Sequence, residues 1–249
     1  MKKTLAPAAA LMTVAICLAG FSRAEETAAE VKKGSPGETA IKEASEANKH
    51  LYIFFYSEDQ DATGETHKAF EAVVGKMTDV AQAITLKKDA PEEKALIKKF
   101  DLKNAPMPLV LVIAPNGAIT MGGVAQKMTE EKLRAGIASP CQQKCLKALQ
   151  DKKVVLLCAY DKNLAADDPT LKTVTDFKAD SRYTKTTEIV RVDPADNAEK
   201  KFLKQFNITA ESGSTTVMLA PPRTLVKTFA GAVTKEGLEG AFKAASAPG

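Results

Sequence analysis

The apolar run LYIFFY occupies residues 51–56, and a related run, VLLCAY, occupies residues 155–160. Neither run contains a charged residue, and each has about the length of one strand. A strand that is apolar on both faces is typical of the centre of a sheet that helices cover on both sides. The two runs therefore predict two central strands, 104 residues apart, each within an α/β layer structure.

Further matches at almost the same spacing indicate that the chain is a tandem duplication. The pair Ser-Pro at residue 35 recurs at residue 139, again 104 residues later. Three more segments recur in the same order at spacings of 105 or 106: KALIKKFDL (94–102) with KKFLKQFNI (200–208), PLVLVIAP (108–115) with STTVMLAP (214–221), and TEEKL (129–133) with TKEGL (234–238).

Each copy has the same predicted order of elements, αβαβαββα. A serine N-cap followed by proline begins the first helix, and a threonine caps the last. The predicted strands are 51–56, 83–86, one from 108 and 118–121 in the first copy, and 155–160, 188–192, one from 214 and 224–229 in the second. Asn116-Gly117 predicts a hairpin between the last two strands of the first copy. Each sheet should thus contain two parallel strands and an antiparallel hairpin.

This order resembles the thioredoxin superfamily, as do three segments of the first copy: FYSED (55–59), KKFDL (98–102) and Pro108 at the head of LVLVIAPNG. The resemblance covers residues 35–138 and again 139–245. It implies two tandem thioredoxin-like domains, each with a central mixed sheet flanked by helices.

The family's Cys-x-x-Cys pair follows the first strand, and the resemblance places it on Gln60 and Thr63 in the first copy and on Leu164 and Asp167 in the second. The family's buried acid falls on Phe54 and Cys158. The proline that faces the reactive pair is kept as Pro108, after Met107, and is Ser214 in the second copy. Because disulfide exchange needs a thiolate, neither usual site can perform it.

Cys141 and Cys145, in SPCQQKC, are the only other thiol pair. If Ser139 caps a helix, its dipole favours the Cys141 thiolate, and Cys145 lies on the same face, so the pair could be redox-active or hold a metal. Cys145 also matches the apolar position Ile41, which favours a buried thiol. Cys158 is predicted in the core, and a structural bridge between Cys145 and Cys158 is a further alternative.

Two histidines and an acidic loop are the other polar candidates. His50 and His67 have no partner at ligand spacing, so both are predicted to be solvated. Glu58, Asp59 and Asp61 crowd the loop after the first strand; a cation could bind there, but an ordinary polar loop is the favoured interpretation.

No cofactor is predicted. Met107, Met121 and Met128 suggest either soft-metal binding or, as we favour, core packing. Three cysteines without a nearby histidine are a weak zinc or copper signal. The sequence has no Gly-rich phosphate loop, Ser-His-Asp order or HExxH motif.

Residues 1–24 have the pattern of a signal peptide, with an apolar run at 5–20 and a cut predicted after Ala24. An uncleaved anchor and lipidation at Cys17 are the alternatives. We expect a lead-in at 25–34, domains at 35–138 and 139–249, a periplasmic or secreted location, and no later membrane span. The leader contains three basic residues and no acid, so its removal lowers the formal net charge from +4 to +1. Nucleic acid is therefore not a predicted partner.

The favoured function is non-catalytic binding of a protein or extended peptide, at Met107, Pro108, Gln60 and Thr63. The alternative is a thiol-disulfide oxidoreductase or soft-metal handler that uses Cys141 and Cys145. The sequence leaves the partner, the cysteine pairing and the oligomeric state open.

Overall fold

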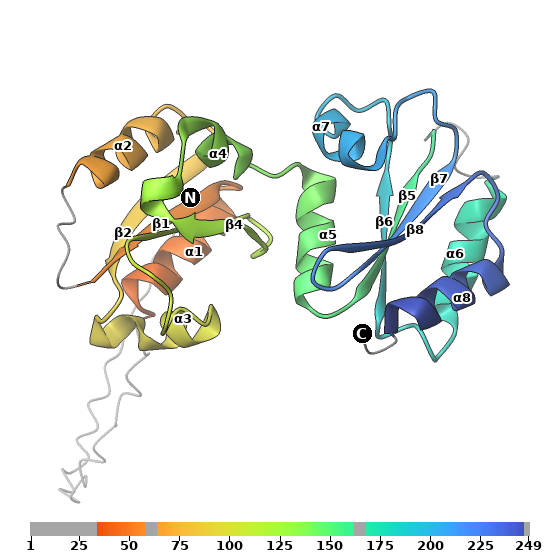
Figure 1. Cartoon of the computed structure of the whole chain (residues 1–249), viewed down its shortest axis with the longest axis horizontal. Helices are drawn as coiled ribbons and strands as arrows, with labels where there is room; N and C mark the ends of the chain where they lie inside the picture. The colour runs from red at the N-terminus through yellow and green to blue at the C-terminus, as the bar shows by residue number, and fades with distance from the viewer. Residues whose placement is uncertain (1–33, 58–63, 162–167, 247–249) are drawn as a thin grey trace, which may run out of the picture. The chain divides into compact units, whose positions relative to one another are not determined.

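The structure is a computed structural model that describes residues 34–57, 64–161 and 168–246. Within these ranges it contains two four-stranded mixed sheets, each flanked by helices (Figure 1). The fold is two tandem thioredoxin-like α/β domains, as predicted. We call the part from α1 to α4 the first domain and the part from α5 to α8 the second domain.

The first domain comprises α1 (Pro36–Glu46), β1 (His50–Tyr56), α2 (Glu65–Val74), β2 (Ala81–Lys87), η1 (Pro91–Glu93), α3 (Lys94–Lys99), β3 (Leu109–Ile113), β4 (Ile119–Val124), η2 (Ala125–Lys127) and α4 (Glu130–Ala135). The second comprises α5 (Pro140–Gln150), β5 (Val154–Ala159), α6 (Pro169–Ala179), β6 (Thr187–Val192), α7 (Lys200–Leu203), η3 (Lys204–Phe206), β7 (Thr215–Ala220), β8 (Thr224–Ala230) and α8 (Lys235–Ser246). None of the helices in the described ranges is both long and apolar enough to cross a bilayer.

The two sheets have the same topology, with strand orders β2-β1-β3-β4 and β6-β5-β7-β8. The central strand pairs in parallel with one neighbour and antiparallel with the other, which leads into the hairpin. The register is also repeated: Phe54 lies opposite Thr85, and Cys158 lies opposite Arg191. The duplication therefore preserves individual strand pairs as well as the order of elements.

Local signals explain where the elements begin and turn. Ser35 and Glu38 form a reciprocal capping box at the start of α1, and the Ser139 side chain caps α5. Thr129 caps α4 in the same way. At the hairpin between β3 and β4, Gly117 has φ +80°, a conformation that glycine adopts without steric cost.

Alternation along β1 divides the core of the first domain between the two faces of its sheet. Leu51, Ile53 and Phe55 pack in a cluster that includes residues of α1 and α3. Tyr52 and Phe54 pack on the opposite face in a cluster that includes residues of α2 and α4. Because both faces are covered, the central strand is apolar throughout, which is why the sequence reveals it so clearly.

Candidate functional site

The candidate site is the end of the central strand, where the reactive dithiol of a thioredoxin would follow. Gln60 and Thr63, and likewise Leu164 and Asp167, lie outside the described residues. The acidic residues Glu58, Asp59 and Asp61 lie outside them too.

The position of the family's buried acid is apolar in the first domain. Phe54 is buried, and its ring lies 4.8 Å from the His67 ring and 5.4 Å from the Phe70 ring, measured between centroids. Its counterpart in the second domain, Cys158, is also buried. Neither side chain is a carboxylate, so the usual proton-handling group is absent at both positions.

The Met107–Pro108 peptide bond is cis and directly precedes β3. Pro108 is buried, whereas Met107 is half-buried and packs against the cluster on the α1 and α3 face. The Pro108 carbonyl accepts a hydrogen bond of 2.8 Å from the Ala125 N–H. This bond fixes the segment after β4 beside the proline.

A groove of about 400 Å³ lies between α2 and α4. Its apolar wall is formed by Phe70, Val73, Val110, Ala125 and Leu133. Its polar margin includes Glu65, Thr66, Gln126 and Glu130. Ala125, which lines the groove, donates to the Pro108 carbonyl, but neither Met107 nor Pro108 is among the residues that line it. An apolar wall with two acidic residues suits apolar side chains flanked by basic ones.

The second domain has a different arrangement at the equivalent position. Gly231 donates a 2.8 Å hydrogen bond to the Ser214 carbonyl, which repeats the bond between Ala125 and Pro108. The Ser214 hydroxyl donates to the Asp168 carboxylate (2.9 Å), and the other oxygen of that carboxylate accepts from the Thr170 N–H (2.7 Å). A satisfied polar network thus replaces the proline, while the backbone hydrogen bond is kept.

Cys141 lies in the first turn of α5, as predicted, but the environment does not favour its thiolate. The thiol is buried, and it donates to the Arg191 carbonyl at 3.2 Å. Burial and the nearby Glu199 carboxylate raise the pKa of Cys141 to about 12. The expected dipole effect is therefore outweighed, because desolvation and a like charge both oppose the thiolate.

Cys145 and Cys158 pack on opposite faces of the second sheet. Cys145 shares a cluster with Val155, Leu157 and Ala159 of β5, whereas Cys158 shares one with Leu156. Since successive residues of a strand point to opposite faces, a Cys145–Cys158 bridge cannot form in this fold. Burial raises the pKa of both thiols, that of Cys158 to about 11.

The three thiols are free. No group of three or more His, Cys, Asp or Glu side chains in the described part of the chain could hold a metal ion. Met107, Met121 and Met128 are partly buried and pack against core clusters, so the core-packing interpretation is confirmed.

The prediction of solvated histidines was wrong, because both rings are buried. His50 Nε2 accepts a 3.1 Å hydrogen bond from the Ala138 N–H, and burial lowers the pKa of His50. His67 Nε2 lies 2.7 Å from the Thr85 hydroxyl, and its ring packs edge-on to Phe54. Each imidazole fills apolar space with its carbon atoms while a ring nitrogen keeps a polar partner.

Two buried glutamates were missed by the sequence reasoning. Glu93 is 1% exposed and accepts from the Ser35 hydroxyl (2.8 Å) and the Gly37 N–H (2.9 Å). Glu199 is 2% exposed and accepts from the Ser139 hydroxyl and the Cys141 N–H. The available signal was their spacing: Glu93 and Glu199 are 106 residues apart, like the helical segments that follow them.

No family model matches the chain, and no curated protein matches its sequence. Among solved structures, the first two thioredoxin domains of Naumovozyma dairenensis Eps1p are 13% identical, with 89% of this chain and 98% of that one covered and a TM-score of 0.30. A domain of alkylhydroperoxide reductase AhpF from Enterococcus faecalis is 15% identical, with 82% and 98% covered and a TM-score of 0.30.

A single thioredoxin, Deadhead from Drosophila melanogaster, is 20% identical, with 41% of this chain and 88% of that one covered and a TM-score of 0.32. The class of protein follows from the strand order and register described above: the chain contains a tandem pair of thioredoxin-like domains.

Proposed function

We propose that this protein is an exported, non-catalytic binding module whose first domain holds an extended peptide segment of a partner protein. The observation that carries this proposal is the groove of about 400 Å³ between α2 and α4, whose lining residue Ala125 donates a hydrogen bond to the Pro108 carbonyl. Export to the periplasm or beyond is proposed from the signal-like pattern of residues 1–24.

The chemistry of the thiols supports a binding role over disulfide exchange. The sequence has no cysteine at either usual dithiol position. The thiols of Cys141, Cys145 and Cys158 are buried, and their pKa values are all raised. Since the thiolate is the attacking species, each is a poor nucleophile near neutral pH.

The lining of the groove defines the kind of peptide. The core residues Phe70, Val73 and Leu133 form the apolar floor of the groove, and the exposed Ala69 and half-buried Met128 offer apolar surface to a side chain of an extended segment. Glu65 and Glu130 lie at its margin, although Glu130 already pairs with Arg134 at 2.8 Å. We therefore expect a segment with apolar side chains next to a lysine or arginine.

The test is to block the groove with a large side chain and to measure the affinity for a fluorescent peptide of alternating valine and lysine. Binding is followed by fluorescence anisotropy. Ala69 is exposed on α2 and lines the groove, so Ala69→Arg should block it and repel lysine. We expect a loss of at least about tenfold in affinity. Ala95→Arg is the matched control, because Ala95 is an exposed helical alanine away from the groove.

Circular dichroism must show that both variants are folded. The proposal is wrong if the wild-type protein does not bind the peptide, or if Ala69→Arg binds it as the control does. Replacing Cys141 and Cys145 with serine distinguishes this proposal from the alternative function. The replacement should leave peptide binding unchanged, whereas it would abolish a thiol- or metal-based activity.

A further inference from the structure

Each domain has a cavity beside the helix that precedes the hairpin. In the first domain it measures about 430 Å³, borders α3, and is lined by Lys88, Lys94, Lys98 and Lys103 together with Asp89 and Asp101. In the second domain it measures about 540 Å³ and includes Lys200, Lys204, Asn207 and Glu211. Lys94, Lys98 and Asp101 correspond, 106 residues later, to Lys200, Lys204 and Asn207. The cavity is thus a repeated feature of the fold.

The same turn builds both cavities. Asp101 (φ 53°) and Asn207 (φ 57°) are left-handed residues just after the helix. The next N–H bonds back to a helical carbonyl, from Leu102 to Ile97 at 2.9 Å and from Ile208 to Leu203 at 3.2 Å. Such a helix end reverses the chain, so the following residues form a wall facing the helix.

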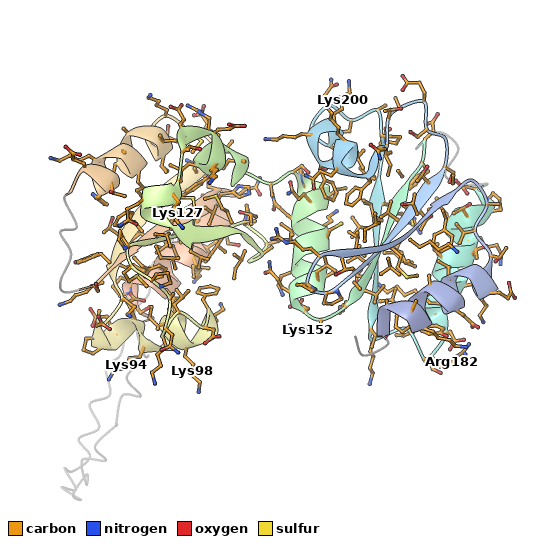
Figure 2. The ribbon with its side chains drawn as sticks, viewed as in Figure 1. Lys94, Lys98, Lys127, Lys152, Arg182 and Lys200 are labelled. Atoms are coloured by element: carbon orange, nitrogen blue, oxygen red, sulfur yellow. The ribbon has the colours of Figure 1, made fainter. Side chains whose placement is uncertain are left out.

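The positive charge of the lysines in the first cavity is only partly balanced by the two aspartates of its lining. Lys94, Lys98 and Lys103 are exposed, and none forms an ion pair with another described residue. Figure 2 shows Lys94 and Lys98 projecting outward from α3. The Lys88 ammonium donates to the Lys103 carbonyl at 3.3 Å, which ties the two sides of the cavity together. Four lysines and two aspartates give the lining a formal charge of +2.

We propose that this cavity, the lysine cavity, binds a small organic anion with two or more negative charges. A dianion would neutralise the +2 lining, and lysine ammonium groups bind carboxylate or phosphate oxygens as mobile point charges. Ile97 and the methylene groups of the lysines provide apolar surface for a carbon skeleton. The cavity of the second domain, with two lysines and Glu211, binds the same class more weakly.

The experiment is calorimetric titration of the full chain with citrate at low ionic strength, with inorganic phosphate as a second probe. Lys94→Gln with Lys98→Gln should weaken citrate binding at least about tenfold, because two charged contacts are lost. The corresponding double substitution in the second domain, Lys200→Gln with Lys204→Gln, should remove only the weaker binding of citrate to that domain's cavity. The matched control is Lys76→Gln with Lys152→Gln, which removes the same charge from exposed positions outside both cavities.

Citrate binding that is lost in the Lys94 and Lys98 variant and kept in the control supports the proposal. Equal losses in the two variants would show a general charge effect and overturn it. The absence of binding to the wild-type protein at millimolar citrate would overturn it as well. If phosphate binds as tightly as citrate, the carbon skeleton contributes nothing, and the assignment to an organic anion is wrong. Peptide binding in the groove should be unaffected in the Lys94 and Lys98 variant, so the two proposals fail separately.

Discussion

Replacing Glu93 with alanine removes the buried carboxylate that holds the beginning of α1. The Ser35 hydroxyl and the Gly37 N–H then lose their acceptor in a region where Glu93 is only 1% exposed. A hydrogen bond to a charged group contributes about 1.5 to 3 kcal/mol. Relief of the buried charge offsets part of this loss, so we expect a destabilisation of about 3 to 5 kcal/mol. Glu93→Gln keeps one acceptor and should cost about half as much.

The assay is unfolding in urea, with hydrogen exchange measured by mass spectrometry to show which domain has unfolded. Such a local readout is needed because a two-domain chain need not unfold in one transition. The loss in Glu93→Ala should appear in the first domain, and Glu199→Ala should produce a matching loss in the second. Glu92→Ala is the control, since Glu92 is exposed and its removal should cost less than about 0.5 kcal/mol. A loss of less than about 1 kcal/mol for Glu93→Ala would refute the reasoning.

Two further predictions concern the thiols and His50. With a pKa of about 12, Cys141 is thiolate in about one molecule in ten thousand at pH 8, so the folded protein should react with iodoacetamide about a thousandfold more slowly than a free thiol; rapid labelling before unfolding would contradict this. The pKa of His50 is lower in the folded than in the unfolded state, where it is 6.5, so its contribution to stability is full above that value and is lost as the pH falls through the folded pKa. Urea midpoints measured from about pH 7 to pH 5 should therefore fall, and less steeply in His50→Gln; identical slopes would count against the role of His50.

The fold could be predicted from the sequence because the strongest sequence patterns are local or occur twice. The apolar runs that became β1 and β5 are buried on both faces, and Asn116-Gly117 forms the hairpin that the pair predicts. Because the chain is duplicated, each element is predicted independently from two segments of the sequence. The topology could therefore be predicted from apolar runs and turn residues, whose conformations depend mainly on neighbouring residues in the sequence.

The site was less predictable because burial and pKa depend on long-range packing. The spacing of Cys141 correctly placed it in the first turn of a helix but did not reveal the Glu199 carboxylate beside it. Likewise, nothing near His67 in the sequence shows that Thr85, on the neighbouring strand, lies within hydrogen-bonding distance. Such partners become visible only when the strand register is known.

The buried glutamates also limit where the chain can be divided. Glu93 lies 58 residues after its donor Ser35, and Glu199 lies 60 residues after Ser139, so each closes a long loop back to the helix that opens its copy. A fragment that began at β1 or β5 would retain a carboxylate whose donors had been cut away. Each opening helix is therefore an integral part of its folding unit, and division between residues 138 and 139 keeps every such carboxylate with its own donors.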